Sequence, residues 1–218
     1  TGSGLHPQRQ KGPHVHGAVI SGNNRQLLVT DLGMDKVILY SFDAVSGKLS
    51  PAKRPFAASV PGSGPRLLTF HPGKKLAYVI EEISGTVVCY KYANGRLKQF
   101  QRISTMPVGD TMPPGSADIH VSPDGKFLYA SNRGNVNNIA IYRIGKKGLL
   151  NLVGHQPVLG KTPRNFSLDP TGRYLLCANQ NSDEIVVFMR DGNTGLLTDT
   201  GNRISTGKPV CIKWISIN

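Results

Sequence analysis

The sequence predicts an all-β protein of the β-propeller type, and three observations support this fold class. One pattern of short strands and turns recurs along the chain every 46–51 residues. Each recurrence holds four candidate strands. Gly and Pro, at 25 and 15 of 218 residues, are too frequent for long helices. A four-stranded unit with such a period is typical of a propeller blade. The alternative, a β-sandwich with accidental self-similarity, lacks a reason for a fixed four-strand period.

The pattern is clearest in the stretch Gly115–Tyr142. Ile119–Ser122 alternates apolar and polar residues and is followed by the turn residues Pro-Asp-Gly at 123–125. Phe127–Ser131 is aromatic and apolar, and after a polar loop Ile139–Tyr142 forms a third candidate strand. This stretch therefore predicts three strands joined by two turns.

The same pattern occurs three more times, at Ala18–Tyr40, Leu67–Tyr90 and Asn165–Phe188. The apolar residue before each first turn marks the repeat, and these markers are Ile20, Phe70, Val121, Leu168 and, in the last stretch, Trp214. A fourth candidate strand follows each third strand, at Leu49–Lys53, Leu97–Ser104, Leu149–Pro157 and Leu196–Ser205. The chain is thus predicted to form four complete four-stranded blades.

The domain organisation follows from these repeats. Residues 1–13 have no periodicity and are predicted to be a loop or linker, and residues 14–218 the C-terminal portion of a single propeller. The repeats run at about 14–61, 62–113, 114–161 and 162–208, followed by a closing inner strand at 209–218. A lone first strand needs three more strands to complete its blade. We therefore expect about two to three missing N-terminal blades of the same propeller as the structural partner of this chain.

The chain has 26 Lys and Arg against 13 Asp and Glu, a formal net charge of +13, which indicates anionic partners. Four of the basic residues occupy the same place after the first turn of each repeat and are interpreted as solvated turn residues: Arg25, Lys75, Lys126 and Arg173. The chain has no dense basic run and no Arg/aromatic RNA motif, so no nucleic-acid partner is expected. It also lacks the run of about 18 apolar residues that a membrane span needs.

The three cysteines, Cys89, Cys177 and Cys211, fall within or beside predicted strands and lack metal-ligand spacing. They are expected to be buried thiols, which suits a reducing compartment and a cytoplasmic location.

Polar residues gather at one predicted mouth of the propeller. Because strand direction alternates within a blade, the start of the first strand and the end of the second lie at the same mouth. His16, Arg66 and Arg164 begin first strands, whereas Asp31, Glu82 and Arg133 follow second strands. A ring of differing polar groups is what a small-molecule site needs.

Each of these residues also has a purely structural interpretation. Asp31 could cap a turn, Glu82 could serve only in an ion pair, and Arg164 could be a solvated rim residue. His14 and His16 lie on one strand face, but no third ligand is obvious nearby, so no metal is expected.

At these residues the sequence resembles a known family. The segments PHVHGAVIS, VTDLGMDKVILYSFD, HPGKKLAYVIEE, SPDGKFLYASNRG and PRNFSLDPTGRYLLCANQNSD are similar to those of the seven-bladed propeller lactonases. That family includes the bacterial propeller-type 6-phosphogluconolactonases and the fungal carboxymuconate cyclases. The resemblance extends from about Arg9 to Trp214.

The resemblance implies a catalytic set of His16, Arg66, Glu82 and Arg133. The predicted substrate-binding residues around it are Arg164, Asp31, His14 and Asp118. Asp118 follows Ala117, which stands where the family pattern has Arg, so its role is left open.

The implied activity is hydrolysis of a small anionic substrate, a phosphorylated sugar δ-lactone, without a cofactor. Glu82 or His16 would take a proton from water, one Arg would stabilise the oxyanion, and the other Arg side chains would hold the phosphate. The sequence has no Gly-x-Ser-x-Gly segment, which argues against a serine nucleophile. A muconate-type lactonizing cyclase and a non-catalytic protein-binding propeller are the alternatives.

Overall fold

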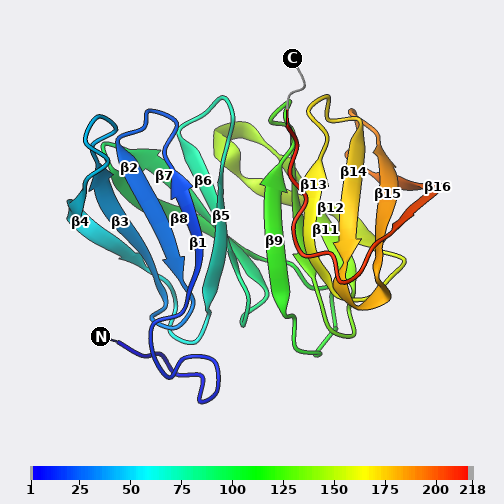
Figure 1. Ribbon diagram of the computed structural model, residues 1–218, viewed down its shortest axis with the longest axis horizontal. Coiled ribbons are helices and arrows are strands. Elements are labelled where there is room, and N and C mark those ends of the chain that lie inside the picture. The colour runs from blue at the N-terminus through cyan, green and yellow to red at the C-terminus, as the bar shows by residue number, and fades with distance from the viewer. Residues whose placement is uncertain (1, 216–218) are drawn as a thin grey trace. The chain divides into compact units, whose positions relative to one another are not determined.

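The computed structural model describes residues 2–215, and its strands form four four-stranded antiparallel sheets (Figure 1). In every sheet the strands are neighbours in the order in which they occur in the sequence. This is the arrangement of a propeller blade, so the predicted all-β fold of four-stranded repeats is confirmed. The chain divides into two compact units, residues 1–103 and 104–218, which are described one at a time.

The first unit holds two sheets. One consists of β1 (Val15–Ile20), β2 (Gln26–Asp31), β3 (Lys36–Phe42) and β4 (Leu49–Ala58). The other consists of β5 (Pro65–Phe70), β6 (Leu76–Glu81), β7 (Thr86–Ala93) and β8 (Arg96–Ser104), whose last residue is the first of the second unit.

The second unit also holds two sheets. One consists of β9 (Ser116–Val121), β10 (Phe127–Asn132), β11 (Asn138–Ile144) and β12 (Leu150–Pro157). The other consists of β13 (Pro163–Leu168), β14 (Tyr174–Asn179), β15 (Glu184–Arg190) and β16 (Leu197–Ser205). Two single 3₁₀ turns, η1 (Lys146–Gly148) and η2 (Gln180–Ser182), complete the described elements. Neither helical turn between residues 2 and 215 has the length or apolar character to cross a membrane.

Side-chain hydrogen bonds fix the turn between β9 and β10. Ser122 Oγ donates to Asp124 Oδ1 at 2.5 Å, and the same oxygen accepts from Lys126 N at 3.1 Å. Gly125 has φ of 69°, a left-handed conformation that favours glycine, and its N–H donates to Ser122 O at 2.8 Å. The Pro-Asp-Gly segment therefore forms the tight turn that the sequence predicts.

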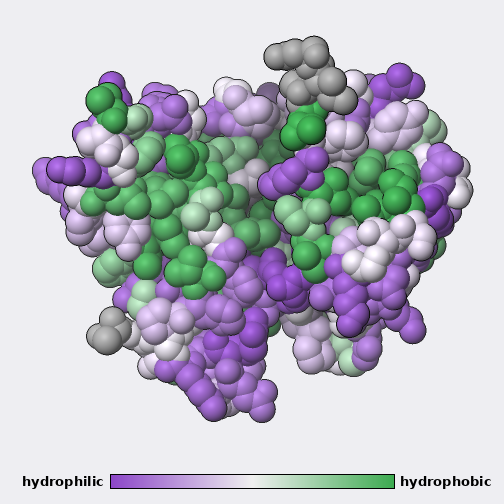
Figure 2. Space-filling view, viewed as in Figure 1, coloured by the Kyte–Doolittle hydropathy of each residue, from purple (hydrophilic) through white to green (hydrophobic). Residues whose placement is uncertain are grey.

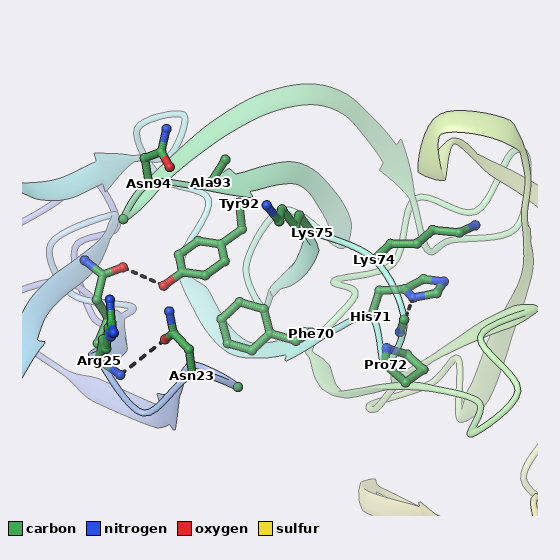
Figure 3. A pocket seen from close by; sticks show the side chains of 14 residues that line it. Asn23, Arg25, Phe70, His71, Pro72, Lys74, Lys75, Tyr92, Ala93 and Asn94 are labelled. Carbon is green, nitrogen blue, oxygen red and sulfur yellow. Dashed lines mark hydrogen bonds between the residues drawn. The ribbon is translucent and has the colours of Figure 1, made fainter. Parts of the chain in front are cut away.

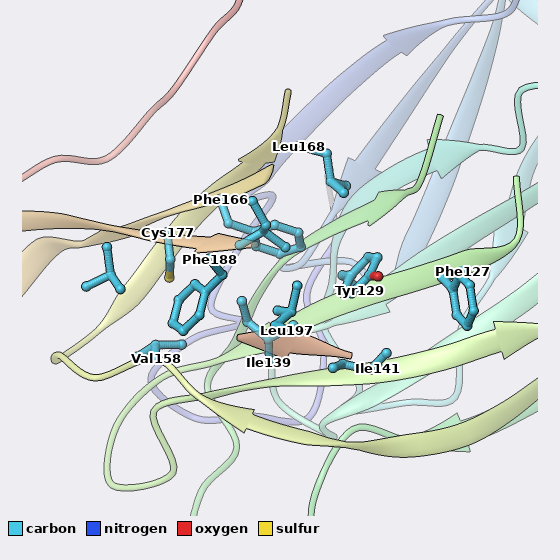
Figure 4. Close-up of a cluster of buried hydrophobic side chains, with 12 residues drawn as sticks. Phe127, Tyr129, Ile139, Ile141, Val158, Phe166, Leu168, Cys177, Phe188 and Leu197 are labelled. Atoms are coloured by element: carbon cyan, nitrogen blue, oxygen red, sulfur yellow. The ribbon is translucent and has the colours of Figure 1, made fainter. Parts of the chain in front are cut away.

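Each unit has its own apolar core. Every residue of β6 and of β10 is buried, whereas the other two second strands, β2 and β14, are buried in part. Leu28, Val79 and Tyr90 belong to the core of the first unit. The core of the second unit is rich in aromatic rings and includes Phe127, Tyr129, Phe166 and Phe188 (Figure 4). In the space-filling view, apolar residues lie over the middle of the strands and polar ones toward their ends (Figure 2).

The C-terminal segment differs from the prediction. Residues 206–215 form no strand, and residues 216–218 of the predicted closing strand lie outside the described part of the chain. The segment instead runs beside β13, where Ile212 N donates to Asn165 Oδ1 at 2.7 Å and Trp214 Nε1 donates to Ser167 Oγ at 3.0 Å (Figure 1). A strand requires a ladder of backbone bonds, whereas these contacts go to side chains. The predicted closing strand therefore has no backbone partner within residues 2–215, and its pairing with strands outside residues 1–218 stays a prediction.

The cysteine prediction holds for two of the three residues. Cys89 and Cys177 are free and buried, and burial raises the pKa of the Cys89 thiol to about 12. Cys211 is free and exposed. Its predicted burial is wrong because it lies in the C-terminal segment, which does not join a sheet.

Candidate active site

The N-terminal loop of the first unit is folded around the buried side chain of Gln10. Its Oε1 accepts from His6 N at 2.9 Å, and its Nε2 donates to Leu32 O at 2.8 Å. Two backbone bonds, from Gly4 N to Gln10 O and from Gln10 N to His6 O, close the loop. The neighbouring Arg9 is thereby held in a defined place, although the loop contains no strand or helix.

Close packing and one carboxylate hold the start of β1. A Cβ on Gly33 would lie 1.9 Å from Gly12 O, so only glycine lets the loop approach the β2–β3 turn this closely. Asp31, 1% exposed, accepts from His14 N at 2.9 Å and from Met34 N at 3.0 Å through Oδ1. Asp31 therefore caps the turn, which is the structural role that the sequence also allowed. Its predicted contact with substrate stays a prediction.

Three of the four predicted catalytic residues converge in the first unit. Glu82, directly after β6, is held by a bond from its N–H to Gly64 O at 2.8 Å. Its Oε2 accepts from Arg66 Nε at 2.8 Å and lies 3.9 Å from His16 Nε2. The other oxygen, Oε1, accepts from Arg9 Nη2 at 2.5 Å. The carboxylate of Glu82 therefore joins β1, β5 and the N-terminal loop.

The imidazole of His16 is neutral at pH 7. Burial, followed by the positive charge of Arg66, lowers the pKa of His16 from 6.5 to about 4, against the opposing effect of Glu82. Its Nε2 is buried and has no hydrogen-bond partner among residues 2–215. The His14 ring stacks on it with centroids 4.6 Å apart. A neutral imidazole has one nitrogen that can accept a proton, so His16 has the state that a general base requires.

Exposure separates the two arginines around Glu82. The Arg66 side chain is 6% exposed and Glu82 is 9% exposed, so this ion pair is shielded from water. The Arg9 side chain is 39% exposed. Arg66 therefore serves to hold the carboxylate, whereas Arg9 also presents part of its guanidinium to solvent.

Two predicted arginines, Arg133 and Arg164, lie in the second unit. Half-buried Arg133 donates from Nε to Gly115 O at 2.7 Å. Arg164 at the start of β13 is partly exposed, and its side chain has no hydrogen bond or ion pair within the described range 2–215. The roles predicted for both residues stay predictions.

Asp118 on β9 is buried, and its Oδ2 accepts from Phe166 N at 3.1 Å and pairs with His120 Nε2 at 3.1 Å. Burial alone would raise the pKa of Asp118, but His120 and the backbone N–H donors outweigh it and lower that pKa. The carboxylate therefore ties β9 to β13, and its predicted contact with substrate stays untested.

Sequence reasoning missed Arg9. Residues 1–13 have no periodicity, and Arg9 lies outside the repeats that identified the other site residues. The one available signal was its position just before the PHVH segment. Among residues 2–215, no group of three or more His, Cys, Asp or Glu side chains is arranged to hold a metal ion.

Comparisons with known proteins identify the family of this chain. Residues 1–214 match a family model described as Lactonase, 7-bladed beta-propeller. The chain is 44% identical over 172 residues to a 6-phosphogluconolactonase of Formosa agariphila, covering 78% of the chain and 48% of that protein. It is 36% identical over 219 residues to the 6-phosphogluconolactonase of Bacillus subtilis, covering 99% of the chain and 61% of that protein.

Solved structures give the same result. The periplasmic gluconolactonase PpgL of Pseudomonas aeruginosa superposes with a TM-score of 0.92 at 36% identity, over 98% of this chain and 60% of that one. A Lactobacillus plantarum protein superposes with a TM-score of 0.92 at 33% identity, over 99% and 62%. The chain thus spans about half to three fifths of the length of these relatives. Because the match runs through all four repeats, the chain belongs to the seven-bladed β-propeller lactonase family.

Proposed function

We propose that the protein hydrolyses the δ-lactone of a phosphorylated sugar acid. The names of its two curated relatives, both 6-phosphogluconolactonases, support this reaction class. The observation that carries the proposal is the neutral imidazole of His16, whose unpaired Nε2 lies 3.9 Å from the ion-paired carboxylate of Glu82. This arrangement supplies a proton acceptor together with a fixed negative charge beside it.

His16 is the better candidate for the base. Both carboxylate oxygens of Glu82 already accept hydrogen bonds from arginines, whereas His16 Nε2 is unpaired. In the reaction, His16 Nε2 takes a proton from water while the water oxygen attacks the lactone carbonyl carbon. The imidazolium that forms is stabilised by the nearby Glu82 carboxylate. The tetrahedral intermediate then collapses, the ring C–O bond breaks, and the leaving alkoxide oxygen takes the proton back from His16.

Arg9 provides donors for an anion. Within residues 2–215 its partly exposed side chain forms one hydrogen bond, to Glu82, so the remaining guanidinium N–H groups can bind the oxyanion or the substrate phosphate. Such a fork suits phosphate and carboxylate oxygens better than a single ammonium does.

The test is hydrolysis of δ-6-phosphogluconolactone and of unphosphorylated δ-gluconolactone, each measured against buffer because both lactones open spontaneously. We expect hydrolysis well above the buffer rate, with a lower KM for the phosphorylated lactone. His16→Asn should reduce kcat by about 10²-fold or more. Hydrolysis of neither lactone above the buffer rate would overturn the proposal. Turnover of a muconate lactone in its place would indicate the cyclase reaction.

A further inference from the structure

A hollow opens in the first unit at the opposite ends of the strands from Glu82. It has a volume of about 770 Å³ and is formed by three turns, at residues 22–26, 70–75 and 92–95 (Figure 3). These turns connect β1 to β2, β5 to β6 and β7 to β8. Glu82 follows the end of β6, whereas the second turn precedes its start, so the hollow is separate from the candidate active site.

The lining of the hollow is cationic. Arg25, Lys74 and Lys75 line it, and none of its lining residues is an Asp or Glu. Two asparagine side chains, Asn23 and Asn94, add uncharged polar groups. A concave surface with several cations and no counter-charge attracts a small anion, and phosphate oxygens accept charge-assisted hydrogen bonds from Lys and Arg.

Two aromatic rings form the wall between these polar groups. Phe70 and Tyr92 lie with ring centroids 5.1 Å apart, and Figure 3 shows them between the side chains of Arg25 and Lys74. The Tyr92 hydroxyl donates to Gln26 Oε1 at 2.5 Å, which fixes the ring. Both rings are partly exposed. An aromatic wall of this kind can pack against the flat face of a sugar or a base.

In the second unit, the protein's own side chains occupy the position that corresponds to this hollow. The strand register makes Arg190 the counterpart of Tyr92, and Asp124 the counterpart of Asn23. Arg190 Nη2 donates to Asp124 Oδ2 at 2.6 Å, and its Nη1 donates to Gly172 O at 2.7 Å. Arg190 is buried, at 8% exposed. The protein's own ion pair thus occupies the second unit's version of the hollow.

The first unit lacks both members of that pair. Tyr92 stands in place of the buried arginine, and Asn23 stands in place of its carboxylate partner. The lysine and arginine side chains of the turns are still present. We propose that this hollow binds a small organic phosphate, with a sugar or base ring against Phe70 and Tyr92 and the phosphoryl group held by the cations that flank these rings. The proposal is independent of the lactonase reaction, because it concerns the other ends of the strands.

The experiment is calorimetric titration of the purified protein with AMP, ribose 5-phosphate and inorganic phosphate at low salt. We expect AMP or ribose 5-phosphate to bind at least about 10-fold more tightly than inorganic phosphate, since only they engage the rings. Raising the salt concentration should weaken binding, because the cations are exposed. Which of the two organic phosphates binds better shows whether a base or a sugar lies on the rings.

The decisive variant is the double substitution Asn23→Asp and Tyr92→Arg, which introduces the pair that fills the hollow in the second unit. It should abolish binding while lactone hydrolysis remains at the parent rate. A second variant, Lys74→Ala with Lys75→Ala, should weaken binding by about 10-fold or more and avoids any repacking of the rings. Lys126→Ala is the matched control, because Lys126 is an exposed turn cation and the counterpart of Arg25 in the second unit.

Two results would overturn the proposal. One is organic phosphates binding no better than inorganic phosphate. The other is Lys126→Ala weakening binding as much as the double lysine variant, which would show diffuse attraction to a basic surface. Because lactone hydrolysis is measured in the same samples, a failure of phosphate binding is distinguishable from a failure of the proposed enzyme function.

Discussion

Arg66 and Glu82 form a shielded ion pair, with Arg66 Nε 2.8 Å from Glu82 Oε2 and neither side chain more than 9% exposed. Arg66 lies on β5 and Glu82 directly follows the neighbouring β6. The second guanidinium, of Arg9, reaches the same carboxylate from the N-terminal loop. Removing one member of such a group leaves buried charge without its partner, which is strongly destabilising.

Glu82→Gln should therefore weaken the fold as well as the activity. The substitution keeps the size of the side chain but leaves two guanidinium groups without a carboxylate. We expect the free energy of unfolding to fall by about 3 kcal/mol, measured by urea denaturation. The double variant Arg9→Gln/Glu82→Gln should be less destabilised than the sum of the two single variants. Strict additivity would show that Arg9 and Glu82 are not coupled.

The pH dependence of the reaction tests the role of His16. A base with a pKa of about 4 stays neutral through mildly acidic conditions, so kcat/KM should hold down to about pH 5 and fall only near pH 4. The measurement is the pH profile of lactone hydrolysis after subtraction of the buffer rate. If kcat/KM instead fell near pH 6.5, the imidazole of His16 would titrate as an exposed histidine does, in contradiction to its burial in the structure.

The same lowered pKa predicts a loss of stability in acid. Below pH 6.5 the unfolded chain takes up a proton on His16 that the folded protein resists until about pH 4. The free energy of unfolding should thus decrease as the pH falls from 6.5 to 4, by about 2–3 kcal/mol from this residue. His16→Asn removes this contribution, so its stability should depend less on pH across that window than the parent's does.

Arg190 should be a major stabilising residue of the second unit. It is buried and bonds to Asp124, to Gly172 O and, from Nε, to Tyr129 Oη at 3.1 Å. Arg190→Ala leaves the Tyr129 hydroxyl without one partner and should lower the free energy of unfolding by about 3 kcal/mol in urea denaturation. Arg203→Ala is the control, because its pair with Asp199 is largely solvated and should contribute little to the free energy of unfolding.

Arg133 should affect substrate binding more than stability. Its side chain is half-buried, and Arg133→Ala should raise KM for the phosphorylated lactone by about 10-fold. Exposed Arg54 on β4 provides the control, since Arg54→Ala should leave KM unchanged. An unchanged KM in Arg133→Ala would remove this residue from the predicted catalytic set.

The repeats could be predicted because their signals are local. Alternation of apolar and polar residues and turn segments such as Pro-Asp-Gly act over a few residues, so the four-stranded sheets follow from the sequence. The closing strand at 209–218 could not be judged in this way. Its apolar pattern suits a strand, but a strand also needs a backbone partner, and over residues 209–215 the chain instead bonds to side chains of β13.

For the site, the sequence by itself determined which residues stand at equivalent ends of the repeats, because strand direction alternates regularly. This was enough to bring His16, Arg66 and Glu82 together as candidates. Only the tertiary structure decided that Arg9 joins them and that His16 is neutral, since burial and ion pairing depend on segments far apart in the chain. It likewise decided that Arg190 fills the space between two repeats of the second unit. In the first unit, Tyr92 leaves the corresponding space open. Such differences arise where side chains of separate repeats meet, and no local pattern records them.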